Sequence, residues 1–206
     1  MPDNNDAVAE TGAMAGGQSL KGREIVLGVC GGIACYKAAD LCSKLVQRGA
    51  GVTVVMTAEA KKFVAPLTFE ALSGRGVRTD AFDLSSSNDP QHISLTEKAD
   101  LMLVAPATAN VIAKVACGLC DDLVSLMVSA AACPVAFAPA MNSRMWENPI
   151  TRANVEKLRG LGYAFVGPEA GWLACRNVGA GRLAEVGAIV EEVARVTGEP
   201  KARGKR

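Results

Sequence analysis

The chain has 206 residues, a formal net charge of +1, and a composition that is 50% hydrophobic but only 4% aromatic. This length suits one α/β domain with a sizeable core, and the balanced charge does not call for nucleic acid or an anionic membrane as a partner. Seven cysteines without an export signal favour reduced thiols in a cytoplasmic protein over a disulfide framework.

Apolar runs of strand length alternate with helical patterns along the chain. In order, we expect strand 23–30, helix 33–48, strand 52–56, helices 58–63 and 66–73, a polar loop 83–91, a short segment 92–99, strand 101–105, helices 106–117 and 121–132, strand 135–138, helix 149–161, strand 163–166, a glycine-rich loop 167–181 and helix 184–196. This alternation predicts a parallel sheet with right-handed crossovers and helices on both faces, a three-layer α-β-α fold. We expect a disordered tail at 1–21, one domain at 22–197 and a mobile basic tail at 198–206.

In such sheets, ligands lie at the carboxyl ends of the strands. Gly31 and Gly32 follow the first strand at the start of a helix, where backbone N–H groups and the helix dipole favour a phosphate. A glycine turn needed only for tight packing is an equally good interpretation of this pair. Because the chain has neither a Gly-x-Gly-x-x-Gly fingerprint nor a Walker Gly-Lys-Ser/Thr, a mononucleotide such as a flavin fits better than a dinucleotide or a nucleoside triphosphate.

The stretch 139–146 follows a buried strand and presents one amide, one cation and one indole. This pattern indicates a loop that faces a ligand. Asn142 is, however, also a residue type that commonly caps a helix. Taken alone, the segment favours an ordinary connection.

Two further side chains are candidates for acid–base chemistry. His92 is the only histidine, and imidazole titrates in the range of a general base, although a lone histidine is more often a surface or capping residue. Cys175 lies in a loop with several glycines and two arginines, which predicts a lid over an anionic substrate, whereas the other six cysteines lie in or beside apolar segments. A surface loop with an incidental thiol is the simpler alternative. Cys117 and Cys120 lack the second pair that zinc needs, so no metal site is expected.

Taken together, segments 31–34, 106–110 and 139–146, His92 and the Cys175 loop resemble the flavin-dependent cysteine decarboxylases. The resemblance covers residues 24–196 and keeps the family's motifs in their order. It implies a flavodoxin-like, Rossmann-like fold, bound FMN, and a homo-oligomer, either a trimer or a dodecamer built from trimers, with the active site at a subunit interface. The implied activity is decarboxylation of the small molecule (R)-4'-phosphopantothenoylcysteine to 4'-phosphopantetheine in coenzyme A biosynthesis, without nucleic acid or membrane as partners.

The resemblance also implies roles for individual residues. His92 is the catalytic base and Cys175 the proton donor of the final reduction. The implied substrate contacts are Asn142, which holds the carboxylate, with Met145, Ala174 and Arg182. The implied FMN contacts are Gly31, Gly32, Ile33, Ala34, Thr57, Phe63, Pro106, Ala107, Thr108, Ala109, Asn110 and Met141. Arg144 and Arg182 are alternatives for the substrate phosphate.

The chain departs from the family's pattern directly after the lid cysteine. The family usually has glycine there, whereas this chain has Arg176, and arginine disfavours a positive φ. We expect the chemistry to survive if Arg176 adopts a negative φ.

The implied chemistry explains the residue types. An acylated cysteine loses CO₂ with difficulty because the carbanion left behind has no electron sink and the blocked amine cannot form a Schiff base. Oxidation of the side chain to a thioaldehyde supplies that sink while the flavin holds two electrons, and loss of CO₂ then gives an enethiol. Return of the two electrons from the flavin to the enethiol, with a proton from Cys175, gives a saturated thiol. A neutral amide at Asn142 orients the carboxylate without stabilising its ground state as strongly as an arginine would.

Two alternatives stay open from the sequence alone. One is a peptidyl-cysteine decarboxylase that stops at the enethiol, and the other is a non-catalytic FMN-binding regulatory protein. Cys175 favours the full cycle, because a proton donor is needed only when the enethiol is reduced.

Overall fold

A computed structural model describes residues 19–80 and 91–198, with residues 91–94 described by their backbone alone. The greater part of both expected tails, at 1–18 and 199–206, lies outside the described residues. Leu20 is only 1% exposed and belongs to the core. The folded region therefore begins before residue 22, the boundary that we expected.

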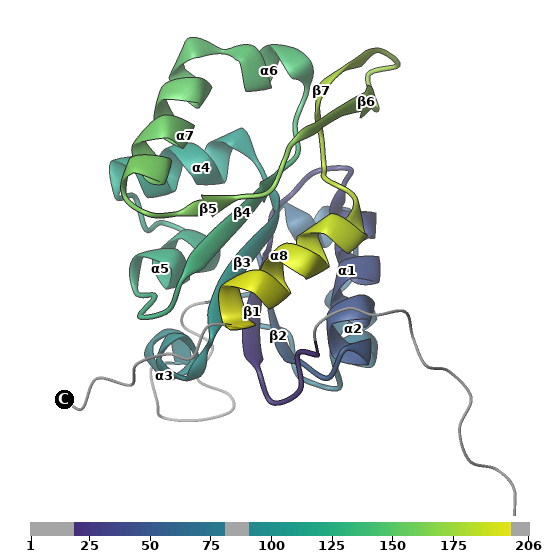
Figure 1. The fold of residues 1–206 in the computed structure, drawn as a ribbon, viewed down its shortest axis with the longest axis vertical. Coiled ribbons are helices and arrows are strands. Elements are labelled where there is room, and N and C mark those ends of the chain that lie inside the picture. Colours follow the sequence, from purple (N-terminus) through teal and green to yellow (C-terminus); the bar gives the residue numbers. More distant parts are fainter. Residues whose placement is uncertain (1–18, 81–90, 199–206) are drawn as a thin grey trace, which may run out of the picture.

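Five strands form one parallel sheet in the order β2-β1-β3-β4-β5 (Figure 1). They are β1 (Glu24–Val29), β2 (Gly51–Met56), β3 (Leu101–Ala107), β4 (Val135–Pro139) and β5 (Ala164–Phe165). In register, Leu27 of β1 lies between Val54 of β2 and Leu103 of β3. This is the flavodoxin-like strand order, whose direction reverses between β1 and β3 and leaves a crevice at their carboxyl ends. The expected fold class and all five expected strands are confirmed.

The helices cover both faces of this sheet (Figure 1). They are α1 (Cys35–Gln47), the 3₁₀ turn η1 (Ala60–Lys62), α2 (Pro66–Ser73), α3 (Gln91–Lys98), α4 (Ala109–Cys117), α5 (Leu123–Ser129), α6 (Ser143–Glu147), α7 (Pro149–Gly160) and α8 (Val186–Gly198). The segment expected at 92–99 is thus helical, and α6 was not expected. Within the described ranges, no helix is long and apolar enough to cross a membrane.

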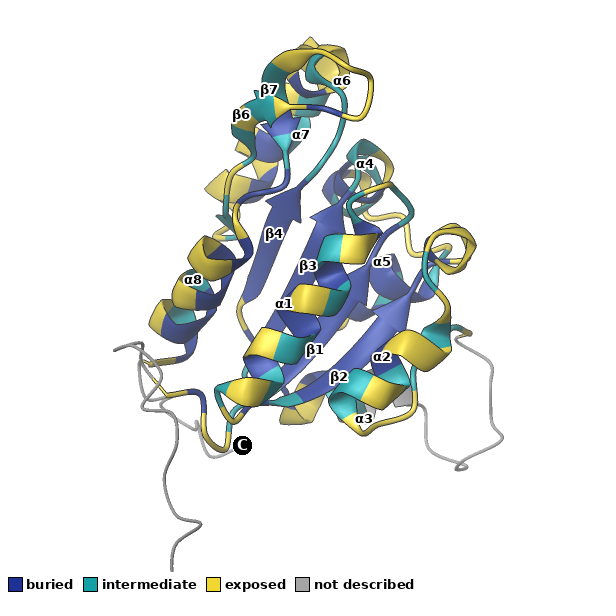
Figure 2. Cartoon of the chain, turned by 90° about the vertical axis from the view of Figure 1, so that its right-hand side faces the viewer, coloured by how far each residue is buried: buried dark blue, intermediate teal, exposed yellow. Residues whose placement is uncertain are grey.

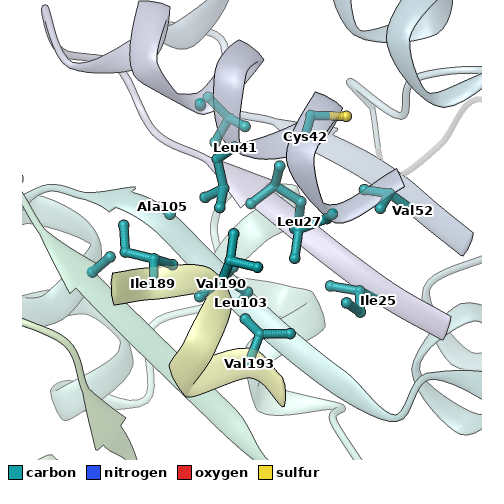
Figure 3. Packing of buried hydrophobic residues seen from close by; sticks show 14 of the residues in the cluster. Ile25, Leu27, Leu41, Cys42, Val52, Leu103, Ala105, Ile189, Val190 and Val193 are labelled. Atoms are coloured by element: carbon teal, nitrogen blue, oxygen red, sulfur yellow. The ribbon is translucent and has the colours of Figure 1, made fainter. Parts of the chain in front are cut away.

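The core has two layers because strand side chains alternate between the faces of the sheet. Ile25 and Leu27 of β1 pack with α1, α2 and α8, whereas Val26 packs with α4, α5 and α7. Figure 3 shows the first layer, in which Leu41 of α1 and Val190 of α8 meet the strands. Figure 2 shows that the helices bury one face and expose the other.

The prediction of a glycine-rich loop at 167–181 is wrong, because this segment forms an antiparallel hairpin of β6 (Glu169–Trp172) and β7 (Val178–Arg182). With α6, the hairpin rises beyond the carboxyl ends of the sheet (Figures 1 and 2). Its tip is a three-residue loop closed by two hydrogen bonds of 2.9 Å, from the Leu173 N–H to the Asn177 carbonyl and from the Arg176 N–H to the Leu173 carbonyl. A loop of this length takes a left-handed residue in its last position.

Arg176 occupies that last position with a φ of 63°. The negative φ that we gave as a condition is therefore not met, and the turn imposes on an arginine the backbone that glycine adopts freely. Because Arg176 is exposed, the left-handed backbone is accommodated without any displacement of the core.

We expect Arg176→Gly to raise the free energy of unfolding by about 0.5–1 kcal/mol, because relief of the left-handed penalty exceeds the entropy that glycine adds to the unfolded chain. Urea denaturation measures this change. Arg176→Ala is the matched control, since it removes the same charge but keeps a Cβ at positive φ. Equal stability of the two variants would contradict the backbone explanation.

Candidate active site

A cavity of about 630 Å³ opens where the loops after β1, β3 and β4 meet the β6–β7 hairpin. This volume is in the range of small-molecule and cofactor sites. The predicted site residues that line it are Gly31, Gly32, Ile33, Ala34, Pro106, Thr108, Ala109, Met141, Asn142, Met145, Ala174, Cys175 and Arg182. The three loops and the β6–β7 hairpin, which are far apart in sequence, thus meet at one cavity.

Four predicted FMN contacts do not line this cavity. Ala107 is fully buried and faces the α4 and α5 layer of the core. Thr57 is 6% exposed, and its Oγ1 accepts the Ala60 N–H at 3.2 Å, which caps the 3₁₀ turn. Phe63 and Asn110 are exposed outside the cavity. Alternation along β3 thus directs Ala107 into the core, and capping of the 3₁₀ turn holds the Thr57 side chain.

His92 lies in the first turn of α3, and its side chain is outside the described residues. The assignment of His92 as a base therefore stays a prediction.

The surroundings of the two glycines after β1 differ, so the absence of a side chain has a different consequence at each position. A Cβ on Gly31 would collide with the Cβ of Glu59 and would lie 2.8 Å from the Glu59 carbonyl carbon, so this glycine allows two loops to touch. A Cβ on Gly32 would meet nothing within 4 Å, although Gly32 lines the cavity. The packing interpretation holds for Gly31, and the ligand interpretation fits Gly32.

The start of α1 beside these glycines carries no side-chain cap. The start of α4, by contrast, is capped by Thr108, whose Oγ1 accepts the Val111 N–H at 3.3 Å. The Cys35 and Lys37 N–H groups already donate to the Gly32 and Ala34 carbonyls at 3.0 Å, so the uncapped, positive dipole end of α1 is the feature that favours an anion in the cavity.

Asn142 performs two tasks at the start of α6. Its Oδ1 accepts the Arg144 N–H at 2.9 Å and so caps the helix, while its Nδ2 donates to the Cys175 Sγ at 3.1 Å. Because the cap fixes the oxygen, the amide N–H groups face the hairpin. Both expectations for Asn142 are therefore compatible: it caps a helix and it presents a hydrogen-bond donor to the cavity.

The hairpin approaches Asn142 closely because β7 has glycine where it passes the loop after β4. The Met141 N–H donates to the Gly181 carbonyl at 2.9 Å, and a Cβ on Gly181 would collide with the Met141 carbonyl oxygen. Any larger residue at 181 would lift the hairpin, and with it Cys175, from Asn142.

Cys175 is distinguished by its place in the cavity and not by exposure. Cys117 and Cys120 are also exposed, contrary to our expectation that they pack in apolar surroundings. Cys30 and Cys42 are buried, and burial raises the pKa of Cys42 to about 11. Buried thiols of this kind stay protonated and unreactive.

Arg182 lines the cavity, and its guanidinium pairs through Nη2 with carboxylates at the base of the hairpin, while its buried Nε has no hydrogen-bond partner among the described residues. Its Nη2 lies 2.8 Å from Glu169 Oε2 and 3.0 Å from Glu185 Oε1. Glu169 Oε1 also accepts the Glu185 N–H at 3.1 Å. Arg182 thus ties β6, β7 and the start of α8 together. Arg144, the other arginine considered for a phosphate, is exposed and does not line the cavity.

The remaining cavity residues were missed from the sequence. They are Tyr36, Lys37, Ala140, Trp172, Leu173, Gly181 and Leu183. Tyr36 and Lys37 fall in the first turn after the predicted phosphate loop, so their position signalled a role. Trp172 lines the cavity, whereas Trp146 is a buried anchor with the Arg152 guanidinium 5.5 Å from its ring centroid.

The family model named Flavoprotein matches residues 14–198, a range that includes every residue that the structure describes. The chain belongs to the Flavoprotein family. Within this family, it is 49% identical over 168 residues to the coenzyme A biosynthesis bifunctional protein CoaBC of Vibrio cholerae serotype O1. That alignment covers 82% of this chain and 42% of the relative, so the chain spans less than half the length of the curated relatives it matches.

Two solved structures share the architecture of this Flavoprotein family member. One is a PPC decarboxylase mutant, C175S, complexed with pantothenoylaminoethenethiol, with 31% identity, a TM-score of 0.77, and coverage of 86% of this chain and 99% of that chain. The other is the FMN-dependent cysteine decarboxylase SpaF, with 30% identity, a TM-score of 0.76, and coverage of 88% and 100%.

Proposed function

We propose that the chain is an FMN-dependent carboxy-lyase that converts (R)-4'-phosphopantothenoylcysteine to 4'-phosphopantetheine in coenzyme A biosynthesis. The observation that carries this proposal is the Asn142 amide directed at the Cys175 thiol, 3.1 Å away, at the wall of a cavity that also borders an uncapped helix start. The CoaBC relative and the two decarboxylase structures support the reaction class.

The cavity fits FMN by its shape and by its donors. Gly32 leaves open space beside the positive dipole end of α1, which suits the flavin phosphate. Pro106, Thr108, Ala109 and Met141 line a largely apolar wall that suits the ring. When bound, FMN supplies a reversible two-electron acceptor next to the substrate.

The glycine pair gives a test of this fit. We expect Gly31→Ala to lower the free energy of unfolding by about 1–3 kcal/mol, because the new methyl collides with Glu59. Gly32→Ala is expected to change it by less than about 0.5 kcal/mol but to weaken FMN binding about tenfold, since its methyl occupies the open space. Urea denaturation of the flavin-free protein and a fluorescence titration with FMN measure the two effects. Unchanged FMN affinity in Gly32→Ala would refute the phosphate site.

The protein's own groups perform three tasks in the proposed reaction. Asn142 donates from Nδ2 to the substrate carboxylate, since its Oδ1 is occupied by the Arg144 N–H. His92 removes the thiol proton of the substrate. Cys175 gives a proton to the enethiol carbon, and the hairpin that carries it shields the substrate from water.

We further propose that the active protein is a homo-oligomer, either a trimer or a dodecamer built from trimers, in the cytoplasm. Large apolar side chains at the cavity support an interface there: Ile33, Tyr36 and Trp172 are 60%, 62% and 65% exposed. Free thiols at all seven cysteines fit a reducing compartment. A monomer in sedimentation velocity would contradict the assembly.

The deciding experiment uses mass spectrometry to follow FMN-loaded wild-type protein with phosphopantothenoylcysteine. We expect release of CO₂ and a saturated thiol. An enethiol product, lighter by two hydrogens, would favour a decarboxylase that stops halfway. Absence of CO₂ from this substrate and from a peptide with a C-terminal cysteine would leave an FMN-binding regulatory protein.

A further inference from the structure

The β6–β7 hairpin, which rises beyond the sheet (Figure 1), has one packed face and one exposed face. On the packed face, Leu173 is 7% exposed, and a Cβ on Gly179 would collide with the Ser143 Oγ of α6. Trp172 pairs across the strands with Val178, so these two side chains share the other face. They are 65% and 75% exposed.

The two members of this exposed pair differ in their relation to the cavity. Trp172 lines it, whereas Val178 does not. Aromatic side chains at the wall of a cavity typically contact the apolar part of a ligand. The three residues after Trp172, up to Cys175, also line the cavity, so the hairpin forms a continuous wall from the indole to the thiol.

The backbone of the hairpin tip holds the indole and the thiol at a fixed separation. The Leu173 N–H donates to the Asn177 carbonyl and the Arg176 N–H to the Leu173 carbonyl, both at 2.9 Å. Trp172 precedes Cys175 by three residues, which span at most about 10 Å of backbone. A group that contacts both side chains therefore has a length of this order.

The acyl arm of the proposed substrate has that length. Roughly nine bonds separate the cysteine Cβ from the carbon that bears two methyl groups in the pantoyl unit, which equals the backbone of about three residues, or at most about 10 Å. This dimethyl carbon is the most apolar part of the arm. With its cysteine end between Asn142 and Cys175, the arm is long enough to bring these methyl groups to Trp172.

We propose that Trp172 contacts the dimethyl carbon of the pantoyl unit and makes the protein select acyl-cysteines whose acyl arm carries this branched group. The inference rests on the proposed function, which supplies the acyl arm. Contact with the methyl groups removes apolar surface of both partners from water. An acyl arm without the two methyl groups leaves more of the indole hydrated and therefore binds more weakly.

Two non-reacting probes test this selection. They are 4'-phosphopantothenate and its analogue without the two methyl groups, and calorimetry with FMN-loaded protein measures both affinities. We expect wild type to prefer the methylated probe about tenfold, because the analogue loses the contact of two methyl groups. In Trp172→Ala, we expect this preference to fall to about twofold or less. Trp172→Phe keeps an aromatic ring and is expected to retain most of the preference.

Val178→Ala is the matched control, because it truncates the other member of the exposed pair, outside the cavity. It is expected to keep the wild-type preference. Thermal unfolding, sedimentation velocity and a fluorescence titration with FMN are expected to give wild-type values for Trp172→Ala. If this variant loses its assembly or its FMN affinity, Trp172 serves the interface or the cofactor, and the inference is overturned.

An equal preference for the methylated probe in wild type and in folded Trp172→Ala would also overturn the inference, as would failure of wild type to bind either probe. The proposed function is judged separately, by CO₂ release from phosphopantothenoylcysteine in wild-type protein. If wild type releases CO₂ but the preference does not depend on Trp172, only the role of Trp172 fails. If wild type releases no CO₂ but the preference does depend on Trp172, the contact stands and the decarboxylase proposal fails.

Discussion

Asn142→Ala is expected to slow CO₂ release from phosphopantothenoylcysteine by about a hundredfold or more. The substitution removes the Nδ2 donor that faces the Cys175 Sγ at 3.1 Å and, in the proposed reaction, the substrate carboxylate. Loss of one preorganised donor at a reacting group has effects of this size. Stopped assays of CO₂ with FMN-loaded protein measure the rate.

The chain offers a close control for the structural part of this change. Asn148 caps α7 as Asn142 caps α6: its Oδ1 accepts the Ile150 N–H at 2.9 Å, the same distance as the Arg144 N–H to Asn142. Each alanine variant is expected to lose about 1 kcal/mol of stability with its cap. Asn148→Ala must nevertheless keep near wild-type turnover. Equal loss of activity in both variants would show that capping, and not the amide donor, matters.

Cys175→Ser is expected to release CO₂ but to lower the yield of saturated thiol about a hundredfold or more, with an enethiol accumulating in its place. A serine hydroxyl is a far weaker acid than a thiol, so the last proton transfer slows most. Mass spectrometry distinguishes the two products.

Cys117→Ser controls for loss of a thiol, because Cys117 is also exposed but lies at the end of α4, outside the cavity. It is expected to give the wild-type product. A normal yield of saturated thiol from Cys175→Ser would remove Cys175 from the reaction.

Hydropathy and the positions of turn residues predicted the sheet well because each strand is a mostly apolar run between polar residues or glycines. All seven residues of β3 are buried, as a central parallel strand requires. The same reasoning missed α6, because five residues are too few for a helical pattern and only the cap at Asn142 marks its start. It also missed the β6–β7 hairpin, because glycine weakens any strand signal.

For the site, motif order located the loops but not the direction of each side chain. Ala107 and Thr108 are adjacent, yet alternation sends the first into the core and leaves the second at the cavity. Lys37 was overlooked because one lysine in an amphipathic helix resembles any solvated charge until its neighbours are known. The ion pairs of Arg182 likewise depend on Glu169, a contact across the hairpin that a linear pattern does not reveal.

The two bonds of Asn142 have a consequence for redesign. The Asn142 oxygen caps the start of α6 and the nitrogen of the same amide faces the cavity, so the point at which the helix starts also sets where the proposed carboxylate contact lies. A variant designed to bind a longer or shorter carboxylic acid therefore needs α6 to start at a different residue. Asn142→Asp would keep the helix start but would place a negative charge against an acid, and Asn142→Gln would lengthen the reach while losing the cap.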